Sequence, residues 1–334
     1  MLRHNICKGL HIKYMSNIPF CRYTLYNTYS SNENKLYDEN KLYGEHQYLS
    51  LVSKVLQDGE IKKGRNGTTK SYFGAQMRFS LKNNTMPLLT TKHIAWKTCL
   101  RELLWFVQGD TNNKNLQNKN VNIWNGNGTR DFLDSRGLYH LNINDLGPVY
   151  GHQWRHFNAP YNTCETDYSG KGIDQLQQII DILTNKHSIE DKYSRRLVIS
   201  AWNPCQINEM ALPPCHIMFQ FYVNQKDELS CSLYQRSGDI GLGVPFNIAS
   251  YSFLVHLIAH HTGLKPGEFI HNIGDCHIYD DHIDTLNTQL YRTPYTFPKI
   301  KILHMRDNIN DYVEQDFYIE NYEYHTKLNM NMRV

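Results

Sequence analysis

The chain has 334 residues, of which 40% are hydrophobic, and its formal net charge at pH 7 is +3. A chain of this length holds one large domain or two small ones. So small a charge produces no global field that would favour DNA or an acidic membrane, and no apolar stretch reaches the roughly 18 residues that a membrane helix needs. An anionic substrate would therefore need a local cluster of arginines.

The eight cysteines form no C-x-x-C pair and show no Cys/His spacing typical of zinc sites. Because the chain is long enough to fold without disulfides, we expect reduced thiols, no bound metal and a cytoplasmic location. The first thirty residues contain four basic residues and no acidic one. A mitochondrial or nuclear location therefore stays open as an alternative.

Residues 1–45 are polar, rich in Tyr, Asn and Ser, and lack hydrophobic periodicity, which predicts a flexible N-terminal extension. Residues 46–334 contain no internal repeat and no linker, so we expect them to form one domain. Its elements follow from apolar spacing. In chain order they are a helix ending near Gly59, a loop over 64–70, a strand over 71–81, helices over 94–107 and 173–183, a strand over 197–202, a hairpin over 217–233, a helix from Asn247 to about Gly263 and a strand over 269–277.

Long helices between hairpin-like strands predict an α+β fold, a mixed β-sheet with packed helices. The longest apolar stretch, residues 248–259, is interrupted by two serines and a histidine. It is typical of a buried core helix rather than of a membrane span.

Cys215 comes at the start of the predicted hairpin and is a candidate nucleophile. A thiol is only partly ionised at pH 7, so a nucleophilic cysteine needs a positive environment, which Arg236 at the other end of the hairpin could supply. His216 would suit a Cys–His protease, but adjacent strand residues point to opposite faces, which disfavours that alternative. The other interpretation of Cys215 is a small buried core residue.

Four arginines occur at predicted element ends. Arg65 lies in the glycine-flanked loop, Arg195 and Arg196 open a strand, and Arg236, followed by Ser237, closes another. A guanidinium group suits phosphate because it donates two parallel hydrogen bonds. The pattern predicts a phosphate clamp, with solvated surface arginines as the alternative.

Two further polar residues fit a nucleotide site. Asn247 can donate and accept hydrogen bonds, which matches the edge of uracil, whereas Asp would suit cytosine better. Its alternative role is a helix N-cap. Glu102 lies among apolar residues of a predicted helix and should have a raised pKa, unless it is a solvated acid beside Arg101.

The run from Ala211 to Tyr251, read as one pattern, resembles the signature region of the thymidylate synthase family, and the resemblance extends over residues 46–334. It implies the single-domain fold of that family and the reductive methylation of deoxyuridylate (dUMP) to thymidylate (dTMP). The co-substrate would be 5,10-methylenetetrahydrofolate, which donates the methylene and the hydride and leaves as dihydrofolate. Cys215 would attack carbon 6 of uracil, and a homodimer would share its active sites.

Carried over position by position, the resemblance implies roles for individual residues. The catalytic set would be Cys215, Glu102, Asn247, Asp239 and Tyr150. The nucleotide would be bound by Arg65, Arg195, Arg196, His216, Arg236, Ser237, Gly238, Asp239 and Asn247, and by His277 and Tyr279 of a D-x-H-x-Y motif. The folate would be bound by Trp124, Asp239, Gly243, Phe246, Arg333 and Val334. The Arg195–Arg196 pair would come from the other subunit.

Two segments depart from the family's pattern. The loop that begins at Arg65 is one residue shorter than the common form, and the chain ends Met332-Arg333-Val334 where many relatives end Ala-Val or Ala-Ile. In the family this tail closes over the folate, so Arg333 adds a charge there.

Two rival functions remain. The related deoxycytidylate hydroxymethylases carry Asp at the position of Asn247, so the Asn favours a uracil nucleotide. A catalytically silent nucleic-acid-binding protein that keeps the fold is disfavoured by the intact Cys215, Glu102, Asn247 and arginine set.

Overall fold

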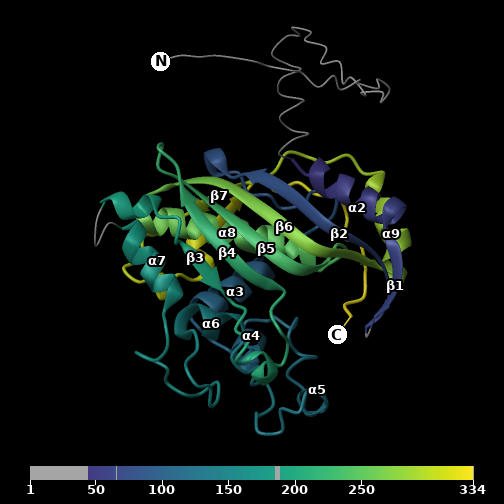
Figure 1. Ribbon diagram of the computed structural model, residues 1–334. Helices are drawn as coiled ribbons and strands as arrows, with labels where there is room; N and C mark the ends of the chain where they lie inside the picture. The colour runs from purple at the N-terminus through teal and green to yellow at the C-terminus, as the bar shows by residue number, and fades with distance from the viewer. Residues whose placement is uncertain (1–43, 65, 185–188, 334) are drawn as a thin grey trace, which may run out of the picture.

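The structure is a computed structural model that describes residues 44–64, 66–184 and 189–333 (Figure 1). The predicted N-terminal extension lies almost wholly outside the described residues. Arg65 and Val334 also lie outside them.

A six-stranded mixed sheet with strand order β1-β2-β6-β5-β4-β3 organises the fold. Its strands are β1 (Glu60–Gly64), β2 (Gly67–Ser80), β3 (Val198–Ser200), β4 (His216–Val223), β5 (Glu228–Asp239) and β6 (Lys265–Tyr279). The β5–β6 pair is parallel and the other described pairs are antiparallel. A separate two-stranded ribbon joins β7 (Lys299–Ile302) to β8 (Phe317–Glu320).

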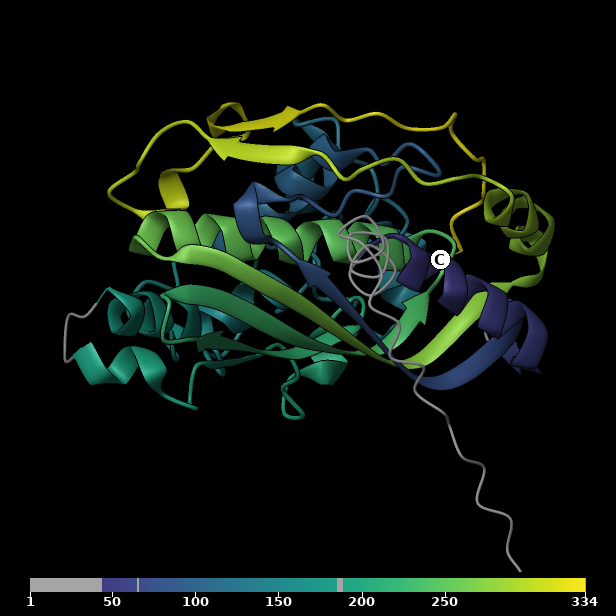
Figure 2. The ribbon, with the colours of Figure 1, turned by 90° about the horizontal axis from the view of Figure 1, so that it is seen from above.

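The helices surround one central member. They are α2 (His46–Asp58), α3 (Trp96–Val107), α4 (Asn113–Gln117), α5 (Arg130–Ser135), α6 (Tyr150–His156), α7 (Gln175–Leu183), α8 (Gly243–Thr262) and α9 (Ile283–Leu290). Helix α8 runs between the large sheet and the β7–β8 ribbon, so the fold has three layers (Figure 2). Residues 248–259 of α8 are all buried, as predicted, because an apolar helix is stable only inside a core. It ends where Gly263 adopts φ 73°, a left-handed cap that glycine takes without strain.

Side-chain alternation gives the large sheet two different faces. In β4, Phe219 and Phe221 are fully buried, whereas Met218 and Tyr222 are 44% and 63% exposed. Alternate strand residues point to opposite faces, so the buried set forms the core and the exposed set forms an outer face. Tyr234 of β5, 38% exposed, lies opposite Met218 on this outer face.

The predicted helices and strands are confirmed, but several of their boundaries were wrong. Helix α8 begins at Gly243 rather than Asn247, because Pro245 is tolerated in a first turn whose N–H groups need no intrahelical partner. Residues 67–70 belong to β2 and pair with β1, with Gly64 opposite Gly67, so these residues are not part of a loop as predicted. Strand β5 continues to Asp239 by parallel pairing with β6, so it does not end at Arg236.

Candidate active site

Most of the predicted site residues meet in one cavity of about 380 Å³. Those that line it are Glu102, Trp124, Tyr150, Cys215, His216, Arg236, Ser237, Asp239, Gly243, Asn247, His277, Tyr279 and Arg333. They come from α3, α6, α8, β4, β5 and β6, from the segments beside them and from the C-terminal tail. A larger cavity of about 790 Å³ lies near Glu45 and Lys82, but no cysteine lines it. The chemistry therefore favours the smaller cavity.

Cys215 is held by hydrogen bonds on both sides of its backbone. Its N–H donates to the Tyr150 hydroxyl at 2.7 Å, and its carbonyl accepts from the Arg236 N–H at 2.9 Å. The Arg236 guanidinium donates to the carbonyls of Pro214 and Pro213, at 2.8 and 3.0 Å. Arg236 therefore fixes the segment that carries the thiol.

Cys215 is not activated in the free chain. Burial raises the pKa of the Cys215 thiol above its usual value, and the nearby charge of Arg236 lowers it by less. The expectation that Arg236 would lie beside the thiol is confirmed. Its charge does not outweigh burial, so the thiol stays protonated at neutral pH unless further positive charge arrives.

His216 also lines the cavity, which contradicts the opposite-face argument. Cys215 precedes the first residue of β4 and the β4–β5 register shifts between His216 and Met218, so strand alternation does not apply here. Burial lowers the pKa of His216 to about 4. Its ring packs against Tyr150 and Tyr251, with centroids 5.3 and 5.4 Å away. No hydrogen bond in the described chain joins it to the thiol, so the protease alternative remains disfavoured.

Glu102 is a partly buried acid on α3 with one strong donor. Trp124 Nε1 donates to Glu102 Oε1 at 2.7 Å. Burial raises the pKa of Glu102 to about 7, and the Trp124 hydrogen bond opposes the rise. The predicted shift is confirmed. The solvated-acid alternative is wrong, because Arg101 turns away to pair with Glu314.

Asn247 lies one turn inside α8 and faces the cavity. Its Oδ1 atom is buried and makes no hydrogen bond of standard geometry among the described residues, although the Asn247 side chain interacts with His216 and opposes the fall in the pKa of that ring. It does not cap the helix, so the N-cap alternative is wrong. Because an unpaired buried acceptor is costly, this atom indicates a ligand that donates a hydrogen bond.

The parallel β5–β6 pair brings a second polar group to the cavity. Asp239 lies opposite His277 in the register, and the His277 and Tyr279 rings meet edge to face at 5.3 Å. The Asp239 carboxylate accepts from the Gly241 N–H at 2.8 Å. Apolar lining comes from Phe106, Ile123, Trp124 and Leu212.

Four predicted residues do not line the cavity. Gly238 is buried beneath it, where a Cβ would lie 2.9 Å from Val244 Cγ2, so packing against α8 requires glycine. Phe246 packs against the core. Arg195 and Arg196 are exposed ahead of β3, which begins at Val198 and not at the arginines as predicted.

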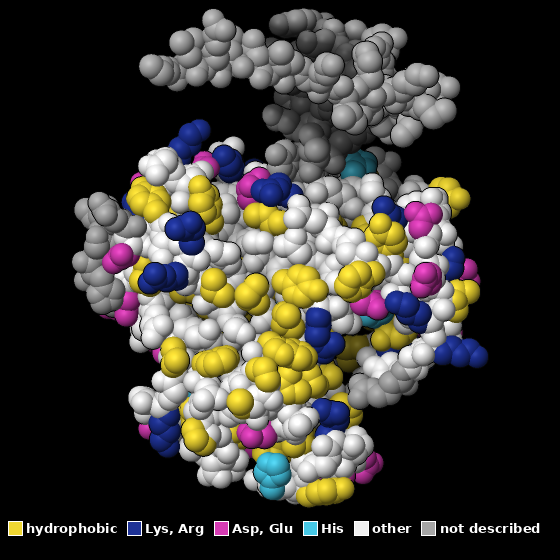
Figure 3. Space-filling model, in the orientation of Figure 1, with side chains coloured by type: hydrophobic (Ala, Val, Ile, Leu, Met, Phe, Trp, Pro, Cys, Tyr) yellow, Lys and Arg dark blue, Asp and Glu magenta, His cyan; other side chains and the backbone are white. Residues whose placement is uncertain are grey.

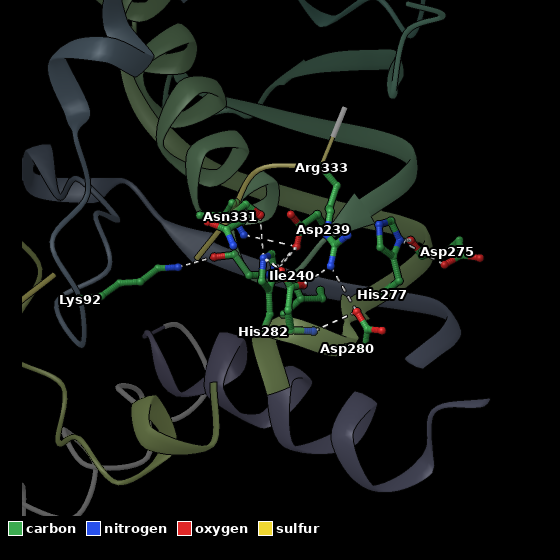
Figure 4. A network of polar contacts seen from close by, with 12 residues as sticks. Lys92, Asp239, Ile240, Asp275, His277, Asp280, His282, Asn331 and Arg333 are labelled. Carbon is green, nitrogen blue, oxygen red and sulfur yellow. Dashed lines mark hydrogen bonds and ion pairs between the residues drawn. The ribbon is translucent and has the colours of Figure 1, made fainter. Parts of the chain in front are cut away.

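Sequence reasoning missed the buried groups that support the cavity wall. Lys92 Nζ donates to the Gly241 carbonyl, and the Tyr48 hydroxyl donates to the Ile240 carbonyl at 2.9 Å (Figure 4). Burial lowers the pKa of Lys92 to about 8. Both groups hold the turn after Asp239. Nothing in the local sequence signals these contacts, because each joins segments more than a hundred residues apart.

Two general features constrain the site. Among the described residues, no group of three or more His, Cys, Asp or Glu side chains is arranged to hold a metal ion. No helix in the described ranges is both long and apolar enough to cross a membrane.

Comparison with known proteins gives a consistent result. A sequence model of the thymidylate synthase family matches residues 46–334. The human thymidylate synthase is 55% identical over 292 residues, which cover 87% of this chain and 91% of that protein. The Saccharomyces cerevisiae enzyme is 50% identical over 300 residues, covering 87% and 97%. A bifunctional dihydrofolate reductase-thymidylate synthase of Leishmania major is 50% identical over 293 residues, which span 87% of this chain and 55% of that protein.

Proposed function

The chain belongs to the thymidylate synthase family, and from this premise we propose how its cavity performs the reaction of that family. The reaction is the reductive methylation of dUMP to dTMP. When bound, 5,10-methylenetetrahydrofolate supplies the methylene group and the hydride and leaves as dihydrofolate. The single observation that carries the proposal is the meeting of Cys215, Glu102 and Asn247 in one cavity.

The Cys215 sulfur attacks carbon 6 of uracil, which makes carbon 5 nucleophilic. The hydrogen bonds that the Cys215 N–H donates to Tyr150 and that its carbonyl accepts from the Arg236 N–H support this role, because they orient the segment that carries the thiol. The raised pKa of Cys215 means that ionisation must accompany substrate binding. Glu102, with a pKa of about 7, is suited to accept and return protons through water near neutral pH.

Asn247 reads the base. Its unpartnered Oδ1 accepts from N3–H of uracil, and its NH2 group donates to the carbonyl at carbon 4. Cytosine offers an acceptor at N3 and would leave Oδ1 unsatisfied. The described contacts of Asn247 therefore support a uracil nucleotide over the hydroxymethylase alternative.

The remaining assignments follow the cavity lining. Arg236 and Ser237 of β5 bind the phosphate together with Arg65, and His277 and Tyr279 bind the ribose hydroxyl. Trp124, Asp239, Gly243 and the tail at Arg333 and Val334 bind the folate, with Phe246 behind them. The flat apolar surfaces of Trp124 and Phe106 support this, because they suit an aromatic ring.

The protein is proposed to act as a homodimer that joins through the outer face of the large sheet. Hydrophobic side chains spread across this face (Figure 3), where Met218, Tyr222 and Tyr234 are exposed. So many exposed large apolar groups on one sheet face support an interface. Arg195 and Arg196 precede β3, at the edge of the same sheet. A second copy would thus gain access to them, and they would add the positive charge that Cys215 lacks.

Residues 46–334 are proposed as the catalytic domain, with residues 1–45 as an extension that precedes it. A cytoplasmic location is proposed because the six described cysteines are free thiols.

The test is a spectrophotometric assay. Wild-type protein is mixed with dUMP and 5,10-methylenetetrahydrofolate, and the absorbance of dihydrofolate is followed. Cys215→Ala should abolish turnover while nucleotide binding survives. Cys231→Ala is the matched control, because this buried cysteine packs in the core of β5. No dihydrofolate from folded wild-type protein, or turnover by Cys215→Ala, would refute the assignment.

A further inference from the structure

The C-terminal tail is tied to the end of β6 by an ion-pair cluster (Figure 4). One terminal guanidinium nitrogen of Arg333 lies 3.0 Å from Asp281 Oδ1 and 3.4 Å from Asp280 Oδ1. We propose that this cluster, Arg333 with Asp280 and Asp281, is a latch that holds the tail over the cavity. Arg333 is then a positioning residue for the folate co-substrate. The inference rests on the proposed function, which places the folate beneath the tail.

Further contacts fix the position of the Arg333 side chain. The guanidinium lies over the Tyr279 ring, 5.8 Å from its centroid. A Cβ placed on Gly67 would be 3.7 Å from an Arg333 nitrogen, so the guanidinium also borders the turn between β1 and β2. The two segments that depart from the family's pattern, the short turn and the charged tail, thus meet in space.

Neighbouring tail residues are held by a hydrogen bond with His282 and by apolar packing, and His282 Nε2 also lies 3.8 Å from Asp281 Oδ1. The Asn331 carbonyl is bonded by His282 Nε2 at 2.8 Å, and Met330 packs against the core. His282 is fully buried, and its other ring nitrogen lies 3.8 Å from the Asp239 carboxylate in the cavity. The tail is therefore fastened at three nearby residues, and the ion pairs of Arg333 are exposed enough for salt to screen them.

The latch is weak enough to release. The Arg333 side chain is 35% exposed, and those of Asp280 and Asp281 are 54% and 29% exposed. Each ion pair with this exposure contributes little free energy to holding the tail in place. A lid that closes during reaction must also open for product release, and a strong pair would oppose opening. The cluster therefore biases the tail toward closure without locking it.

Kinetics with matched variants test the latch. Arg333→Met keeps the length of the side chain and removes its charge, and the double variant Asp280→Asn/Asp281→Asn removes the partner charges. Each should raise KM for the folate by up to about fivefold, the upper limit of what one surface ion pair supplies, and change KM for dUMP less. Combining them should do no more than either alone, because the same interaction is lost. Asp307→Asn, an exposed acid outside the cavity, is the control.

Three results separate the latch from other roles. The charge exchange Arg333→Asp with Asp281→Arg should recover part of the lost folate affinity. Salt should raise the folate KM of wild-type protein more than that of Arg333→Met. Without any substrate, a carboxypeptidase should remove terminal residues faster from Asp280→Asn/Asp281→Asn than from Asp307→Asn.

The latch is overturned if neutralising both acids leaves folate KM and tail digestion unchanged, or if the Arg333 and acid variants have additive effects. Thermal unfolding and dUMP binding of each variant identify any that fail to fold, and the charge exchange then decides. Failure of the proposed function is distinct, because it would show as a wild-type protein that forms no dihydrofolate.

Discussion

Trp124→Phe should move the pH dependence of turnover upward. The indole N–H donates to Glu102 at 2.7 Å and holds its pKa lower than burial alone would. Removing this donor destabilises the carboxylate and leaves the protonated acid unaffected, so the pKa of Glu102 rises above its value of about 7. The phenyl ring keeps most of the aromatic packing, including the contact with Trp105.

The size of the effect follows from the bond that is lost. A hydrogen bond to a charged group contributes about 1.5–3 kcal/mol, and about 1.4 kcal/mol corresponds to one pKa unit. Water in the cavity can replace part of the lost hydrogen bond, so the lower end of this energy range applies. The midpoint of the pH–rate profile should therefore rise by about one pH unit. The direction of the shift does not depend on which form of Glu102 is active. Whether Glu102 governs the rising or the falling limb of the pH–rate profile, that limb moves to higher pH.

Initial rates of dihydrofolate formation across pH measure the midpoint. In Glu102→Gln, the limb of the pH–rate profile that Glu102 governs should be absent. Trp154→Phe is the control, since Trp154 packs against Phe106 and Phe219 and its indole N–H has no partner among the described residues. A midpoint for Trp124→Phe that is unchanged or lower would refute the reasoning about Glu102.

Three further predictions follow from the same cavity. Glu102→Gln should be more stable than wild type above pH 7 by roughly 1–3 kcal/mol. A raised carboxyl pKa makes the folded protein lose stability as pH rises from 4.5 to about 7; urea unfolding should show equal stabilities below this window, and equal stabilities above it would contradict the pKa. Asn247→Asp should weaken the preference for dUMP over deoxycytidylate, at about 1–3 kcal/mol for each lost hydrogen bond; calorimetric affinities for both nucleotides decide, and an unchanged preference would remove Asn247 from base reading. Under conditions that exchange subunits, Cys215→Ala mixed with Arg195→Ala/Arg196→Ala should regain turnover, because one site per heterodimer is intact; inactive heterodimers would place the arginines outside a shared site.

Local patterns in the sequence were enough to predict the elements that carry the site. The alternation in β4 and β5 and the largely apolar stretch of α8 both reflect burial of the residues concerned. Their ends were less predictable. Helix α8 extends back to Gly243 through a proline, and β5 continues to Asp239 because β6 pairs with it. The positions of these ends depend on packing and pairing with other elements, which the sequence of one strand or helix does not specify.

The site residues divide in the same way, into those that the local sequence predicts and those whose contacts depend on distant segments. Cys215, Glu102 and Asn247 were recognisable because their chemistry is unusual in apolar segments. The contact between Trp124 and Glu102 joins a loop to a helix. The Arg236 guanidinium donates hydrogen bonds to the carbonyls of Pro213 and Pro214. Such contacts arise from the packing of distant segments. The Arg333 cluster was foreseen as an added charge at the tail, but its acidic partners were not.

Burial sets the charge of the free cavity, and this bears on how the reaction begins. It raises the pKa of Cys215 and of Glu102 and lowers that of His216, so all three shifts favour the uncharged form. A neutral thiol and a half-protonated acid repel an anionic nucleotide less than their ionised forms would. A neutral thiol is also less prone to oxidation than a thiolate. The cost is that the nucleophile must ionise after the substrate arrives. Arg236 alone does not outweigh burial, so the missing positive charge must come from elsewhere. The exposed Arg195 and Arg196 of a second copy are the cations that the proposed dimer would bring, and this is why the heterodimer experiment tests the chemistry as well as the assembly.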